Sequence, residues 1–171
     1  DGAMFTLFNR VYLLSPKATI LGHYDKIVLT PFGEYIPFQD SVLFFVKKMV
    51  EGIGDFAPGT ARTIFSLESG KFSVLICYEG IFPNLARQFV AGGAEFLVNA
   101  TNDAWFGETS APYQHLAMEA MRAGENRVPL VRSANTGISA VIDLDGRIQE
   151  QTGLSESGFL IGRLAWPKVT T

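Results

Sequence analysis

Apolar residues alternate between strand-like runs and helix-like spacing along the chain. Arg10 to Leu14 and Thr19 to Leu21 flank the turn Ser-Pro-Lys, and this arrangement predicts a β-hairpin. Ile64 to Leu67 and Phe72 to Ile76 flank the turn Glu-Ser-Gly-Lys and predict a second hairpin. The stretch Pro83 to Ala91 begins with a proline and is followed by two glycines, which is typical of a helix.

The second half of the chain continues this alternation. Phe96 to Asn99 is apolar enough for a buried strand, and Gln114 to Glu125 has apolar residues three or four positions apart, which predicts a helix. Further strands are expected at three apolar runs, namely Val128 to Arg132, Ser139 to Ile142 and Phe159 to Leu164. The turn Asp-Leu-Asp-Gly at 143–146 predicts another hairpin. Hairpins combined with strand–helix–strand units predict an α/β fold with a mixed sheet.

Two stretches depart from this regular pattern. Residues Pro31 to Pro37 (PFGEYIP) hold too much proline and glycine for a regular element, yet they place Glu34 among apolar neighbours. Asp40 to Phe56 has the periodicity of an amphipathic helix. Two interpretations of this helix stay open: it packs against the core, or it forms a surface arm that inserts an apolar edge into a membrane interface.

Composition narrows the class of protein. The chain has 171 residues, of which 47% are hydrophobic and 18% charged, so it can bury a core and is not of a disordered class. Its net charge of −3 gives no reason to expect a nucleic-acid partner. The apolar runs are far shorter than the ~20 residues of a membrane-spanning helix. However, the high apolar content, with 14 Phe, suggests a surface that faces lipid or a partner.

Cys77 is the first candidate for chemistry. It is the only cysteine, and an isolated cysteine is usually buried and inert. However, it lies between the predicted strand Phe72 to Ile76 and a predicted helix, and such a turn presents a side chain beside free backbone amides, which suits a nucleophile. His23 and His115 lie in no signature typical of a Cys–His pair, and with one cysteine they make a weak zinc site, so no metal is expected.

Lys26 and Glu34 form a second candidate pair. Most lysines and glutamates are solvated surface charges. The apolar neighbours of Glu34 indicate that it is partly enclosed, and an enclosed carboxylate needs a cationic partner. Lys26, eight residues earlier, is the partner that the sequence offers.

Four motifs in order carry a resemblance to a known family. These are PFGEYIP, the run Ile76 to Glu79 (ICYE), the run Asn102 to Gly107 (NDAWFG) and the run Arg132 to Gly137 (RSANTG). Together with Lys26 they resemble the nitrilase, or carbon–nitrogen hydrolase, superfamily, and within it the bacterial apolipoprotein N-acyltransferase family. The resemblance runs from about Arg10 to Leu164. It implies an α-β-β-α sandwich with mixed sheets, and a domain that occupies residues 1–171 and is incomplete at its N-terminus.

The resemblance also implies a role for each matching residue. Cys77 matches the nucleophile that takes a fatty acyl group from a phospholipid as a thioester. Lys26 matches the lysine that stabilises the oxyanion, and Glu34 matches a glutamate that orients the lysine. Supporting positions are Tyr78, Glu79, Trp105 and Phe106. The stretch around Leu43, Phe44, Phe45 and Val46 matches a mobile arm that lies against the bilayer.

One departure from the family pattern is large. The resemblance implies a general-base glutamate before Lys26, and no glutamate precedes Glu34 in this chain. We therefore expect a fragment of a larger membrane enzyme, inactive by itself, from the bacterial inner membrane with this domain facing the periplasm. Its partners would be a phospholipid donor, a lipoprotein acceptor and the membrane surface, with no cofactor.

Two other interpretations use the same fold. A soluble amidase would use the same residues with water as the acceptor, although such an enzyme has no reason to expose Phe44 and Phe45. A non-catalytic binding domain would hold Cys77 as an inert core residue. Preferential alkylation of Cys77 by a small electrophile separates this last interpretation from the other two.

Overall fold

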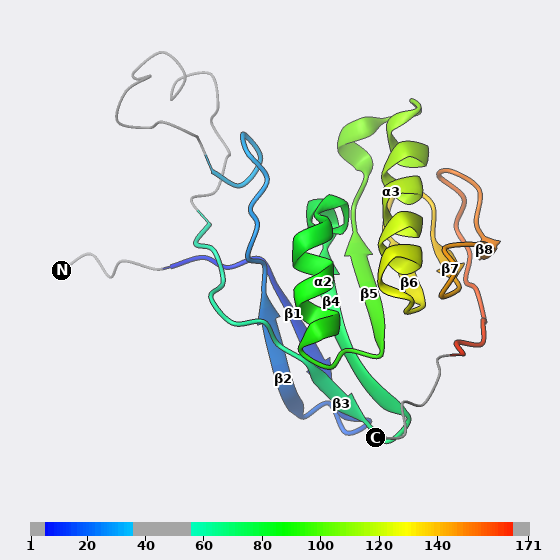
Figure 1. The fold of residues 1–171 in the computed structure, drawn as a ribbon. Coiled ribbons are helices and arrows are strands. Elements are labelled where there is room, and N and C mark those ends of the chain that lie inside the picture. Colours follow the sequence, from blue (N-terminus) through cyan, green and yellow to red (C-terminus); the bar gives the residue numbers. More distant parts are fainter. Residues whose placement is uncertain (1–5, 36–55, 166–171) are drawn as a thin grey trace, which may run out of the picture.

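The structure is a computed structural model that describes residues 6–35 and 56–165 (Figure 1). Two strands form a separate small sheet, β1 (Arg10–Leu14) and β2 (Ile20–Asp25). The main sheet has the order β3-β4-β5-β6-β7-β8, with the strands Phe65–Leu67, Gly70–Ile76, Phe96–Thr101, Leu130–Ala134, Ala140–Ile142 and Ile148–Gln151. The helices are η1 (Cys77–Ile81), α2 (Pro83–Ala91), η2 (Ala104–Phe106) and α3 (Ala111–Asn126).

The main sheet is mixed, as the sequence predicts. The three central strands β4, β5 and β6 are parallel, and hairpins add β3 at one edge and β7 and β8 at the other in antiparallel orientation. The two parallel crossovers run through α2 and α3, which contact each other and lie along the same face of the sheet in Figure 1. Because the carboxyl ends of parallel strands meet at one edge, the segments that follow β4, β5 and β6 come together there.

Aromatic and branched side chains form the hydrophobic core around the main sheet. Phe72 stacks between Phe65 and Phe96 across three neighbouring strands, with ring centroids 5.1 Å apart on each side. Tyr24 of β2 packs edge-on against Phe89 of α2, and this contact joins the small sheet to the main core. Burying side chains of this size is the main source of stability for such a core.

Two sequence predictions need comment. The strand expected at Phe159 to Leu164 is wrong, since this segment has no strand pairing and β8 takes the place beside β7. Its apolar residues Phe159 and Ile161 face solvent, so its alternating pattern does not reflect a buried face. The helix expected from Asp40 to Phe56 and the arm residues Leu43, Phe44, Phe45 and Val46 lie outside the described residues. Within the described ranges, no helix is long and apolar enough to cross a membrane.

Candidate active site

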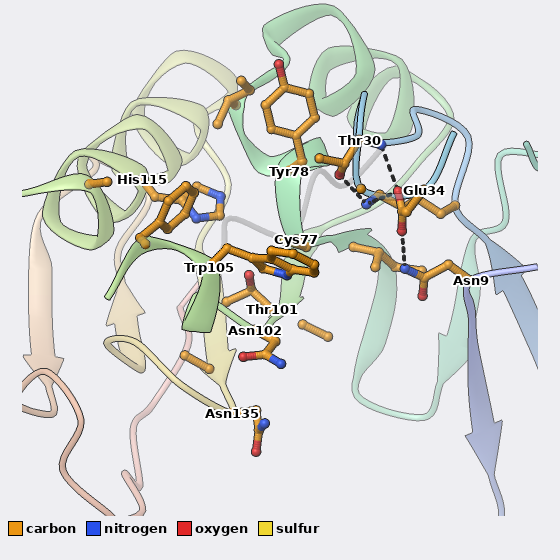
Figure 2. A pocket seen from close by; sticks show the side chains of 18 of the residues that line it. Asn9, Thr30, Glu34, Cys77, Tyr78, Thr101, Asn102, Trp105, His115 and Asn135 are labelled. Carbon is orange, nitrogen blue, oxygen red and sulfur yellow. Dashed lines mark hydrogen bonds and ion pairs between the residues drawn. The ribbon is translucent and has the colours of Figure 1, made fainter. Parts of the chain in front are cut away.

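A cavity of about 1150 Å³ opens at the carboxyl edge of the parallel strands. Several separate segments of the chain contribute to its walls. Most of the lining comes from residues 26–34, 76–81, 100–106, 111–118 and 133–135, and Asn9, Val11 and Phe56 complete it. Figure 2 shows Cys77 near the centre of this arrangement, between Glu34 on one side and Trp105 and His115 on the other.

Cys77 occupies a sharp turn between β4 and η1. Strand β4 ends at Ile76, and Cys77 has a φ of +50°, in the left-handed region that residues other than glycine rarely adopt. Such a conformation costs on the order of 1–3 kcal/mol and is concentrated at functional sites. Tyr78 follows in the first turn of η1, where backbone amides have no carbonyl partner within the helix. The turn therefore places the Cys77 thiol and Tyr78, whose backbone N–H has no partner within the helix, at the same wall of the cavity.

Lys26 and Glu34 form a buried ion pair beside this turn. The Lys26 Nζ lies 2.7 Å from Glu34 Oε2, and the side chains are only 1% and 12% exposed. The Lys26 ammonium also donates to the Thr30 hydroxyl at 3.0 Å. We expected Lys26 to be the partner of Glu34 from their positions eight residues apart, and this geometry confirms the pairing.

Glu34 is held as a carboxylate by further donors. The backbone N–H of Thr30 donates to Oε2 at 2.7 Å, and the Asn9 side-chain amide donates to Oε1 at 2.6 Å. Burial acts to raise the pKa of Glu34, but the hydrogen bonds from Lys26, Thr30 and Asn9 outweigh it and lower this pKa. The Glu34 carboxylate is thus fixed, and it fixes the direction of the lysine ammonium into the cavity.

Glu79 does not line the cavity. Its buried side chain bridges the segment that carries Lys26 and the turn that carries Cys77. Its buried carboxylate accepts hydrogen bonds from the Tyr24 hydroxyl, from the backbone N–H groups of Ile27 and Val28, and from the N–H of Ile76. Burial raises the pKa of Glu79, against these donors. The segment that carries Lys26 is thereby tied to the turn that carries Cys77, so the glutamate expected beside the nucleophile serves as a positioning residue.

Trp105 and Phe106 lie in η2, opposite the Lys26–Glu34 pair. Both side chains line the cavity, and Trp105 is 82% exposed. The loop before η2 is tied to the loop after β6, because Asp103 N–H donates to the Thr136 carbonyl and Asn135 N–H donates to the Thr101 carbonyl. The motifs NDAWFG and RSANTG therefore form one wall together.

A buried charge cluster behind this wall was not anticipated from the sequence. Arg132 pairs with Asp103 and with Glu119, and His115 Nδ1 lies 3.0 Å from Asp103 Oδ1. Burial acts to raise the pKa of Asp103, but His115 and Arg132 outweigh it and lower this pKa. Burial raises the pKa of Glu119 to about 8 despite the Arg132 charge. Arg132 is thus shared between two buried carboxyl groups, of which Glu119 is the weaker acid.

The signal for this cluster was present but ambiguous. Glu119 lies one helical turn after His115 in the helix predicted from Gln114 to Glu125, and Arg132 is the last residue of the strand predicted from Val128. His115 proves to be a buried wall residue of the cavity, bonded to Asp103, whereas His23 is half-exposed beside Asp25.

Comparison with known proteins gives a consistent picture. The carbon–nitrogen hydrolase family model matches residues 2–171. The chain is 50% identical over 164 residues to the apolipoprotein N-acyltransferase of Geobacter metallireducens and 41% identical over 165 residues to that of Rhizobium rhizogenes. These matches cover 96% and 95% of this chain but 31% of each relative, so the chain spans about a third of their length.

Solved structures agree at the level of the fold. The chain matches Saccharomyces cerevisiae Nit3, a member of branch 10 of the nitrilase superfamily, with a TM-score of 0.64 and 21% identity, over 88% of this chain and 51% of that one. It matches an amidase from Nesterenkonia sp. with a TM-score of 0.61 and 25% identity, over 85% and 51%. Both the fold and the whole-length match to the family model lead to one conclusion: the chain belongs to the carbon–nitrogen hydrolase family, and within it is homologous to the apolipoprotein N-acyltransferases.

Proposed function

We propose that this chain is the acyl-transferring domain of an apolipoprotein N-acyltransferase. The observation that carries the proposal is the convergence of Cys77, Lys26 and Glu34 on one cavity, although 51 positions separate Cys77 from Lys26. Homology to enzymes of that name supports the choice of reaction. The roles of the individual residues stay predictions.

The proposed reaction has two steps. The Cys77 sulfur attacks the ester carbonyl of a phospholipid, a C–S bond forms, the C–O bond breaks, and the thiol proton passes through a base to the lysophospholipid oxygen. The α-amino group of a diacylglyceryl-cysteine then attacks the thioester carbonyl. A C–N bond forms, the C–S bond breaks, and a proton passes from the nitrogen to the sulfur, which regenerates the thiol. Lys26 and the Tyr78 amide would stabilise the oxyanion in each step. The family's general-base glutamate has no counterpart before Glu34, so we expect no turnover from these 171 residues alone.

Apolar exposure at the cavity supports a lipid donor. Phe32 and Trp105 are 64% and 82% exposed, and both line the cavity. An acyl chain gains about 0.8 kcal/mol for each CH₂ group that it buries, so such walls favour a fatty ester over a small polar amide. We accordingly place the enzyme at the bacterial inner membrane, with this domain on the periplasmic side.

The proposal is tested with the full-length product of the gene. Phospholipid vesicles and a synthetic diacylglyceryl-cysteine peptide are supplied, and mass spectrometry follows the acylated peptide. We expect acylation by the natural protein, none by Cys77→Ala or Cys77→Ser, and a loss of at least ~10²-fold for Lys26→Ala.

The same assay distinguishes the two competing functions. Release of free acid or ammonia from small amides, without peptide acylation, would assign the site to an amidase. Absence of any product, together with a Cys77 that does not react with iodoacetamide, would indicate a non-catalytic binding domain.

A further inference from the structure

Asn99 is a buried polar residue of β5 that lies behind the Cys77 turn and does not line the cavity. Its side-chain nitrogen donates to the backbone carbonyls of Leu75 and Cys77, at 3.2 Å each. Its side-chain oxygen accepts from Arg132 Nη1 at 3.4 Å. A guanidinium can only donate and a carbonyl can only accept, so these partners admit one orientation of the amide.

The bond to Cys77 is made where the sheet no longer holds the chain. The β4–β5 ladder pairs Leu75 with Asn99 and ends with Ile76 beside Ala100. Cys77 is the next residue, and its left-handed backbone persists only if its surroundings hold it. The Asn99 amide supplies this restraint, because it donates hydrogen bonds to the backbone carbonyls of Leu75 and Cys77, on either side of Ile76.

The side-chain oxygen of Asn99 is in turn held by the buried guanidinium of Arg132. Arg132 is fully buried, donates through Nε to the Ile138 carbonyl at 2.9 Å, and is paired with Asp103 and Glu119. A guanidinium with this many partners cannot rotate away without leaving buried charges unpaired. The Asn99 oxygen is therefore anchored to a fixed donor.

We propose that Asn99 is a positioning residue for the nucleophile: it fixes the Cys77 backbone so that the thiol faces the cavity shared with Lys26. The proposal rests on the acyl-transfer function proposed above. Asn99 acts through the Cys77 carbonyl and touches no reacting atom.

The test compares Asn99→Asp with Asn126→Asp in the full-length protein. Asn99→Asp keeps the shape of the side chain and the oxygen that accepts from Arg132. It loses the two N–H donors and places a second oxygen next to the carbonyls of Leu75 and Cys77. Asn126 donates its side-chain amide to the Arg122 carbonyl at the end of α3, so the control loses a similar bond away from the cavity. Two rates are measured: acyl transfer, and iodoacetamide alkylation of the tryptic peptide Phe72 to Arg87, which contains Cys77.

For Asn99→Asp we expect kcat to fall about 10- to 100-fold with KM nearly unchanged. A misplaced nucleophile slows the chemical step but leaves substrate binding unchanged. Alkylation should slow as well, while Asn126→Asp matches the natural protein in both rates. A folded Asn99→Asp with the kcat and the alkylation rate of the control would overturn the proposal.

A second pair keeps the proposal testable if Asn99→Asp does not fold. Asn99→Gln keeps both amide donors and Asn99→Met has similar length without them, so the glutamine variant should retain the higher kcat and alkylation rate. Equal rates in the two folded variants would refute the role of the amide. If the natural protein transfers no acyl group, the proposed function fails, and the alkylation rates alone still decide the role of Asn99.

Discussion

At the scale of single residues, the site depends on charges that are buried but paired. Lys26 is almost fully enclosed, and the cost of burying its ammonium is offset by Glu34 and Thr30. Glu119 differs from Glu34, because it shares Arg132 with Asp103 and its burial raises its pKa to about 8. The two glutamates should therefore respond to pH in opposite directions.

Glu34→Gln should destabilise the protein and remove its activity. The substitution leaves Lys26 buried without a counter-charge, which costs about 3–5 kcal/mol. The folded-state pKa of Glu34 is lowered, so its stabilising contribution is present above the unfolded-state value of 4.5 and is lost as pH falls through the folded-state pKa. Urea titrations of both proteins from pH 3 to 7 measure this. Equal free energies of unfolding at pH 7 would contradict the pairing.

Glu119→Gln should instead change the stability curve between pH 5 and pH 8. The folded-state pKa of about 8 lies above the unfolded-state value of 4.5, so the folded protein binds more protons between these values and loses stability as pH rises through this window. Glutamine has no proton to lose. We expect the variant to gain stability relative to the natural protein between pH 5 and pH 8, by at most about 5 kcal/mol. A pH-independent difference between the two would show that Glu119 is ionised throughout.

At the scale of elements, the site is assembled by close packing of α3 against η1. Gly80 lies where these two elements meet, and a Cβ at this position would come within 2.6 Å of Glu119 Oε1 and 2.8 Å of Glu119 Cγ. Glu119 is fully buried and paired with Arg132, so it has no room to move aside. The absence of a side chain at Gly80 thus allows α3 to pack closely against the turn that carries Cys77.

Gly80→Ala should lower the free energy of unfolding by about 1–3 kcal/mol, as overpacking of a filled core typically does. Gly158→Ala is the matched control, because its Cβ would meet no atom closer than 3.9 Å, and it should stay within about 0.5 kcal/mol of the natural protein. Urea denaturation of both variants measures the difference. The packing argument fails if the two variants are equally stable.

The order of these elements could be predicted from the sequence, whereas their ends could not. The turn residues around Pro16, Gly70 and Gly146 marked three hairpins, all of which the structure confirms. The strand predicted at Phe159 to Leu164 is wrong: a hairpin places β8 beside β7, and Phe159 to Leu164 pairs with no described strand although β8 has no described partner on its outer edge. Alternating apolar residues alone carry no information about which edge is free.

At the scale of the whole molecule, the cavity is a product of topology. Because β4, β5 and β6 are parallel, Cys77, Asn102 and Ser133 lie at one edge of the main sheet. Lys26, which follows β2 of the small sheet, lines the same cavity. The sequence indicated Cys77, Lys26 and Glu34 through their motifs. The cluster around Arg132 could not be predicted, because its members are far apart in sequence and each has an ordinary interpretation on its own element.

The proposed association with a membrane is tested on the whole protein. Phe44→Ser with Phe45→Ser removes apolar surface from the predicted arm, which lies outside the described residues. Burying each phenylalanine at an interface contributes about 1.5–3 kcal/mol, so vesicle binding should weaken at least tenfold while the melting temperature stays nearly unchanged.

The matched control is Phe159→Ser with Ile161→Ser, which removes a similar area of exposed apolar surface elsewhere. Vesicle co-sedimentation and thermal melting are measured for both double variants. A large drop in melting temperature without a separate loss of vesicle binding would show that Phe44 and Phe45 pack in the core. An equal loss of binding in the control would show that the arm has no special role.

The central claim is that Cys77 carries the acyl group, and trapping the intermediate tests it most directly. The full-length protein is incubated with a labelled phospholipid and no acceptor, quenched in acid and digested with trypsin. The account predicts the acyl mass on the peptide Phe72 to Arg87, its release by hydroxylamine as expected for a thioester, and its absence from Cys77→Ala. Acyl label on any other residue, or label that persists in Cys77→Ala, would contradict it.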